Sequence, residues 1–193
     1  MKLENAFEVP APPSEALKTL LDPNQVIPCM PGAELVEAVD ERTWKAKLTV
    51  KLGPVGMDFT NDVKIVEIDE PAGVVTMTVS GRDTRGKGGA EATIQSRLLA
   101  QDGGGTRVEM DTDLRFSGQA AQLGRPAVVK DVSTKLVEQF ADCLRARLSA
   151  SAAGAPAPPA AGAKPLSGFS LIAVALKGML ARLFRRQPKG ERP

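Results

Sequence analysis

The pattern most suggestive of metal chemistry is "EMDTDLR", in which Glu109, Asp111 and Asp113 recur at every second position. In a β-strand this spacing places all three carboxylates on one face, and clustered carboxylates are typical ligands for hard cations. The same alternation also predicts that this face is exposed to solvent, and Arg107 and Arg115 flank it. A solvated, charge-balanced strand face is therefore favoured, and we predict no metal site.

A second candidate is "SGRDTRGKGGAEA", in which four glycines surround the cations Arg82, Arg85 and Lys87. Glycine-rich basic loops can bind phosphate. This stretch, however, lacks the Gly-Lys-Ser/Thr order of a P-loop, and it joins two predicted strands rather than a strand and a helix. We interpret it as a hairpin turn, and contact of its cations with a partner or with lipid head groups stays open.

The composition excludes several kinds of catalytic site. The chain has no His and no Tyr, so a Ser-His-Asp or Cys-His site is impossible. Its two cysteines, Cys29 and Cys143, lie far apart without the clustered spacing of a zinc or redox site, and we expect structural, unpaired thiols. The N-terminal residues show no secretory signal, and unpaired thiols persist in the cytoplasm. We therefore expect a cytoplasmic protein.

Charge divides the chain into two parts. Residues 151–193 carry seven Lys and Arg against one Glu, a net charge of +6, whereas residues 1–150 carry a net −4 within the total of +2. The acidic body argues against nucleic-acid binding, and the basic tail is a candidate for an anionic surface. We predict one domain over 1–149, an Ala/Pro-rich flexible linker over 150–165 and a separate tail over 166–193.

Alternating residues predict an antiparallel sheet. "MKLENAFEV" has the period of a half-buried strand, and from residue 33 to residue 116 successive alternating runs are joined by turn signals. Clean alternation indicates one buried and one solvated face, as in an antiparallel meander. Two short helices cut by prolines are predicted between the first strand and the rest, and residues 117–149 form a long helical pattern in which Pro126 kinks or begins the main helix.

A bent sheet that grips one long helix readily encloses a cavity. Its apolar lining candidates are the inward positions of the strands, the corner after the short helices and the long helix's apolar face: Phe7, Met30, Met57, Phe59, Val63, Met77, Ile94, Met110, Phe116, Val129, Val132, Leu136 and Phe140. Methionine can adapt to a variable apolar guest, although the four methionines would also serve as ordinary core.

Four inward positions are polar: Asn5, Asn61, Ser96 and Thr112. Buried polar groups need partners. These side chains could pair with one another, hold water, or contact the polar atoms of a bound guest. If the sheet grips the long helix in this way, the soft pair Cys29 and Met30 would lie at a corner beside the mouth of the cavity, and gating and packing explain it equally well.

The order of elements, a strand, two short helices, six strands and a long helix, resembles the α+β helix-grip fold of the START-like and polyketide-cyclase superfamily. "IPCMPGAELVE", "VKLGPVGMDF", "SGRDTRGKGGAEA" and "DVSTKLVEQF" are similar to the family of the carbon monoxide dehydrogenase G subunit. The resemblance implies a curved antiparallel sheet of about seven strands around a long C-terminal helix, with a cavity between them. It also implies a non-catalytic accessory protein that recruits a molybdenum-dependent carbon monoxide dehydrogenase-type enzyme to the cytoplasmic membrane. The cavity would hold a lipophilic molecule such as menaquinone or ubiquinone, and no metal or covalent cofactor is expected.

The tail "LSGFSLIAVALKGMLARLFRRQPKG" combines an apolar helical face with cations. Because Lys177 and Arg182 interrupt it, an interfacial helix on the inner face of the cell membrane is favoured over a spanning one, while docking in a protein groove stays open. The membrane-binding residues we predict are Phe169, Ile172, Leu176, Lys177, Met179, Leu180, Arg182, Leu183, Phe184, Arg185 and Arg186.

These features are compatible with three classes of function. The first is a membrane adaptor that carries a quinone or related lipid, and the second is an assembly factor for a molybdenum hydroxylase with no ligand. An enzyme of the cyclase or hydrolase type is the third, and the lack of His and Tyr argues against it, although a buried Asp or Glu could act as a base.

Overall fold

The computed structural model describes residues 1–52, 55–123 and 125–154, and the whole predicted membrane-binding tail lies outside them. Seven strands form one antiparallel sheet in the order β1-β7-β6-β5-β4-β3-β2. Each strand from β2 to β6 pairs with its successor, and β1 returns to pair with β7. The strands are β1 (Lys2–Val9), β2 (Ala33–Ala38), β3 (Thr43–Leu52), β4 (Val55–Asp69), β5 (Val74–Asp83), β6 (Gly88–Ala100) and β7 (Thr106–Gly118).

The connection from β1 to β2 contains the helices α1 (Pro13–Leu21) and α2 (Pro23–Val26) and the 3-10 turn η1 (Ile27–Cys29). A proline begins both α helices, where its missing N–H costs nothing. Asp22 ends α1 and caps α2, since its side chain accepts the Asn24 N–H at 2.9 Å. Gly32, with φ +79°, makes the turn into β2. The structure agrees here with the predicted pair of short helices cut by prolines.

The C-terminal helical pattern is divided. β7 continues through Gly118, and then α3 (Gln119–Leu123) and α4 (Pro126–Ala152) follow. The prediction of one helical pattern from residue 117 is therefore wrong at its start, and Pro126 begins the main helix. α4 also ends three residues inside the stretch expected to be linker, because the Ala- and Ser-rich sequence there still supports helix.

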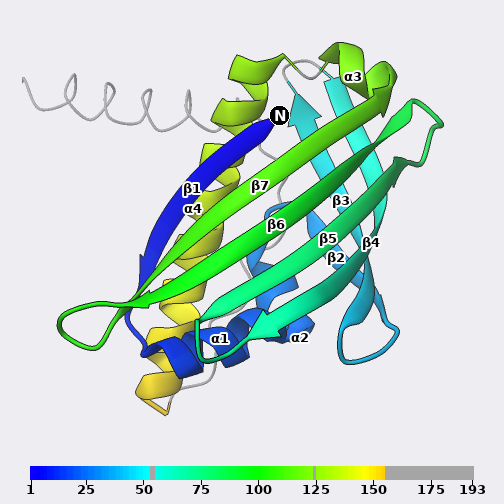
Figure 1. Ribbon diagram of the computed structural model, residues 1–193. Coiled ribbons are helices and arrows are strands. Elements are labelled where there is room, and N and C mark those ends of the chain that lie inside the picture. The colour runs from blue at the N-terminus through cyan, green and yellow to red at the C-terminus, as the bar shows by residue number, and fades with distance from the viewer. Residues whose placement is uncertain (53–54, 124, 155–193) are drawn as a thin grey trace, which may run out of the picture.

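The sheet is curved, and α4 runs along it behind β1, β7 and β6 from the α3 end to the α1 end (Figure 1). α4 turns Val129, Phe140, Ala141, Leu144 and Leu148 into the interior. Most buried residues form one core between the sheet, α1, η1 and α4. A smaller cluster of Met57, Phe59 and Ala120 lies by α3. In the part of the chain described, no helix is long and apolar enough to cross a membrane.

Candidate functional site: an apolar cavity between sheet and helix

A cavity of about 400 Å³ lies between the inner face of the sheet and α4. Strand alternation brings apolar side chains from the sheet to its floor, and α4 covers it with Val129, Val132, Leu136 and Phe140. Leu20, Val26, Ile27 and Met30 line it near the short helices. The rings of Phe7 and Phe140 meet edge to face with centroids 5.7 Å apart, joining β1 to α4 beside the cavity.

Twelve of the thirteen apolar lining candidates surround this cavity. They are Phe7, Met30, Phe59, Val63, Met77, Ile94, Met110, Phe116, Val129, Val132, Leu136 and Phe140. Met57 does not line it, and that prediction is corrected. Met57 is only 1% exposed and packs with Phe59 and Ala120 in the smaller cluster, so its side chain is enclosed by its neighbours and does not reach the cavity.

All four inward polar residues also line the cavity. Asn5 donates from Nδ2 to the Ser133 hydroxyl of α4 at 3.1 Å. Asn61 donates from Nδ2 to the carbonyl oxygens of Ala46 at 3.2 Å and of Phe59 at 3.4 Å. Asn5, Ser96 and Thr112 lie on the neighbouring strands β1, β6 and β7, whereas Asn61 lies on β4, three strands from β7. The cavity thus has two separate polar places in an apolar lining.

Two further lining residues were not among the predicted site residues, although strand alternation predicts that one of them, Trp44, faces inward. Trp44 lies at an inward position of β3 and is 4% exposed. Its place in the strand alternation was a usable signal. Ser133 is polar on the apolar side of α4, and helical periodicity alone would have found it.

The cavity contains little that could do acid–base chemistry. Among the described residues that line it, Lys47 is the one ionisable side chain, and Lys47 is exposed to solvent. The sequence has neither His nor Tyr to serve as a proton carrier. The arrangement favours binding of an apolar molecule with a few polar atoms.

The two cysteines differ from the prediction, because they are bonded to each other. Cys29 in η1 and Cys143 in α4 form a disulfide, with their Cα atoms 5.3 Å apart across a sequence separation of 114 residues. The prediction of unpaired thiols is therefore wrong, and the argument for the cytoplasm that rested on them no longer stands, since disulfides persist in oxidising surroundings. The bond fastens the short helices to α4 at one end of the cavity. Arg147 of α4 reinforces this link by donating to the Gln25 side chain at 2.9 Å.

The glycine-rich basic stretch is the β5–β6 hairpin, as predicted from its turn signals. Its turn is organised by Asp83, whose Oδ2 accepts the N–H groups of Arg85 at 3.1 Å and Lys87 at 3.0 Å. The Lys87 N–H, helped by that of Arg85, lowers the pKa of the Asp83 carboxyl below its ordinary value. Arg85 also pairs with Asp58 at 2.8 Å. These contacts assign the hairpin a structural role.

The alternating carboxylates of β7 are matched by arginines. Arg97 of β6 lies 2.8 Å from Asp111 and 3.9 Å from Glu109, and Arg107 lies 3.2 Å from Glu109. The described residues contain no group of three or more acidic, Cys or His side chains arranged to hold a metal ion. The interpretation as a charge-balanced surface agrees with these ion pairs.

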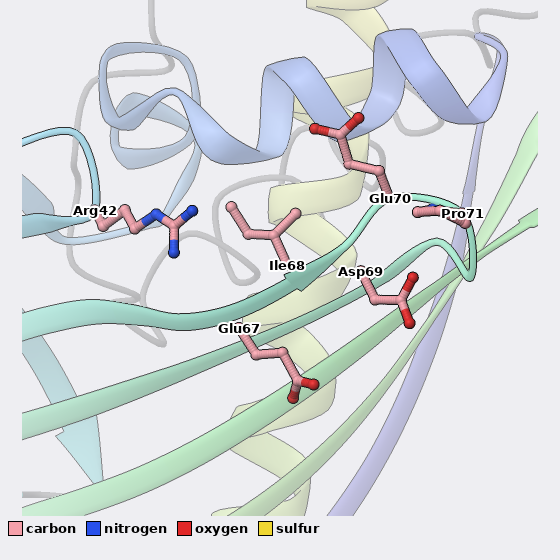
Figure 2. A pocket seen from close by; sticks show the side chains of 6 residues that line it. All are labelled: Arg42, Glu67, Ile68, Asp69, Glu70 and Pro71. Carbon is pink, nitrogen blue, oxygen red and sulfur yellow. The ribbon is translucent and has the colours of Figure 1, made fainter.

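A second hollow lies on the surface at the β4–β5 turn. It is lined by Arg42, Glu67, Ile68, Asp69, Glu70 and Pro71. Figure 2 shows that Glu67 and Asp69 point to one side of the strand while Glu70 points to the other, so the carboxylates do not converge. We assign it no chemistry.

The part of the chain that encloses the cavity matches a known protein family. Residues 6–149 match the family model of the carbon monoxide dehydrogenase G subunit (CoxG). The chain belongs to the CoxG family. The match spans the sheet, the short helices and nearly all of α4. No curated protein matches the chain.

Solved structures share the fold of this CoxG chain. A conserved protein from Geobacillus kaustophilus is 20% identical, with a TM-score of 0.69 over 78% of this chain and 97% of that one. A Thermus thermophilus protein is 15% identical, with a TM-score of 0.55 over 78% and 99%. An aromatase/cyclase from Streptomyces sp. R1128 is also 15% identical, with a TM-score of 0.54 over 81% and 99%. At these identities the likeness shows the helix-grip fold and not the chemistry.

Proposed function

We propose that this CoxG chain is a non-catalytic accessory protein whose cavity holds a lipophilic molecule, an isoprenoid quinone such as menaquinone or ubiquinone. The observation that carries the proposal is the 400 Å³ cavity, whose lining is almost wholly apolar. Small-molecule sites are commonly about 300 to 1,000 Å³, apolar, and furnished with a few polar groups. The cavity is at the lower end of that range, so it suits a quinone ring and the beginning of its tail rather than a whole isoprenoid chain.

The polar lining supports a quinone over a plain hydrocarbon. Hydroxyls at Ser96, Thr112 and Ser133 can donate hydrogen bonds to ring carbonyl oxygens inside an apolar enclosure. The chemistry needed for turnover is scarce, since Lys47 is the one ionisable side chain among the described lining residues. Binding without catalysis is therefore the simplest use of this cavity.

The proposal also includes an enzyme partner and attachment to the membrane. The family's description names carbon monoxide dehydrogenase, and we infer that the protein recruits a molybdenum-dependent enzyme of this type to the cell membrane. The tail over residues 166–193 would supply the attachment. Five cations worth about 1 kcal/mol each at an anionic surface, together with an apolar face, are sufficient for reversible binding. Electrons could then pass from the enzyme to the quinone pool.

The test compares the full chain with a chain ending at Gly154, both purified from whole cells that make the quinone and analysed by native mass spectrometry with lipid extraction. The shortened chain keeps all of α4 and the disulfide. We expect a quinone bound in equal amount to both chains, with only the full chain sedimenting with membranes. Lipid bound to the full chain alone would contradict carriage in the cavity and would favour an anchor or assembly factor. Membrane association of the shortened chain would contradict attachment through the tail.

A further inference from the structure

Asn61 is a polar side chain whose amide orientation is determined by its surroundings. It is 7% exposed, and its Nδ2 donates to the carbonyl oxygens of Ala46 and Phe59 at 3.2 and 3.4 Å. Flipping the amide would place Oδ1 against these two acceptors and lose both hydrogen bonds. The side chain is therefore oriented with Nδ2 toward backbone acceptors and Oδ1 away from them.

Oδ1 of Asn61 lies over Gly81 on the adjacent strand β5. Asn61 pairs with Gly81 in the sheet register, and a Cβ added to Gly81 would collide with Oδ1. The absent side chain thus makes room for the oxygen. Among the described residues, no hydrogen-bond donor reaches Oδ1. Oδ1 is also not among the fully buried side-chain atoms that lack a partner, so it stays accessible. Since Asn61 lines the cavity, Oδ1 is an acceptor that the cavity leaves free for a guest.

The other polar place in the cavity has a different character. Ser96, Thr112 and Ser133 carry hydroxyls, which either donate or accept. They tolerate a carbonyl or a hydroxyl on the ligand equally well. Asn61 can only accept at Oδ1, because both Nδ2 hydrogens are directed to backbone carbonyls. A ligand oxygen that carries no hydrogen would face the lone pairs of Asn61 Oδ1 and leave Oδ1 without a hydrogen-bond partner.

We propose that Asn61 forms an acceptor subsite, so that the cavity prefers an apolar ring bearing a hydroxyl group over the same ring bearing only carbonyl or ether oxygens. This inference rests on the proposed lipophile-binding function. Its natural example is the reduced, hydroquinone form of a quinone. Asn61 and Gly81 would then act together as specificity residues, one supplying the acceptor and the other the space for it.

The experiment uses the full chain and calorimetric titration with two rings of similar size, 2-naphthol and 2-methoxynaphthalene. The ether places an oxygen without hydrogen where the naphthol places a donor. We expect 2-naphthol to bind about tenfold more tightly, a ratio that corresponds to about 1.4 kcal/mol. In Asn61→Leu the ratio of the two dissociation constants should fall close to one, whereas Met77→Leu, an apolar exchange in the same lining, should keep the native ratio.

Gly81→Ala provides a second variant, since its Cβ would collide with Oδ1 and force the Asn61 amide to move, and it should also reduce the ratio. Circular dichroism establishes that each variant is folded. Native protein that binds the ether as tightly as the naphthol overturns the inference, even if every variant unfolds, and leaves lipophile binding standing. Native protein that binds neither ring overturns the inference and the proposed function together.

Discussion

Reduction of the Cys29–Cys143 disulfide is expected to destabilise the protein strongly. The bond closes a loop across a sequence separation of 114 residues, and the chain-entropy relation assigns such a loop about 4.8 kcal/mol at 25 °C. Globular domains are stable by only about 5 to 15 kcal/mol, so the bond accounts for a large part of the total. For a domain of this size the loss corresponds to a fall in Tm of roughly 10 to 20 °C.

The assay is urea denaturation followed by far-ultraviolet circular dichroism, with and without dithiothreitol. The oxidised form should have the higher free energy of unfolding by several kcal/mol. The double variant Cys29→Ala/Cys143→Ala is the control, since dithiothreitol should leave its midpoint unchanged. Equal midpoints for the oxidised and reduced native chain would refute the reasoning. So would two thiols that react with Ellman's reagent in unfolded protein kept under oxidising conditions.

Two further predictions concern the interior and the hairpin. Met57→Ala should cost about 2 to 5 kcal/mol of unfolding free energy in urea denaturation while leaving ligand affinity unchanged, because Met57 packs outside the cavity. Met77→Ala should alter affinity in calorimetry, and equal effects of the two variants on affinity would contradict this assignment. Asp83 has a folded-state pKa below its unfolded value, so it contributes stability above about pH 4 that is lost as pH falls through the folded pKa. The difference in urea midpoint between native protein and Asp83→Asn should accordingly shrink from pH 7 to pH 3, and a constant difference would contradict it.

Strand alternation was sufficient to predict the sheet and most of the cavity. Residues such as Phe7, Met77 and Ile94 face inward by period alone, and the single long helix had to cover that face. Met57 has the same period, but which cluster an inward residue joins depends on where α3 packs. That packing is a tertiary feature that the local pattern does not contain.

The disulfide and the break before α4 could not be predicted for related reasons. Cys29 and Cys143 are distant in sequence, and only the packing of η1 against α4 brings them together. β7 ends later than predicted, because Ser117 and Gly118 still pair with Gly89 and Gly88 of β6. The sequence pattern assigns these two residues to the helical stretch 117–149. Glycine carries no side-chain periodicity, so the strand could not be followed to its end.

The central claim is that the cavity binds a lipophilic ring, and Trp44 allows a direct measurement. It is the one tryptophan of a chain without tyrosine, it is buried, and it lines the cavity. Titration with 2-methyl-1,4-naphthoquinone should quench its emission along a saturable curve with one site per chain. Ala92→Leu, which adds bulk to the lining, should weaken that binding. Quenching that rises linearly without saturation, and equally in the variant, would contradict the account.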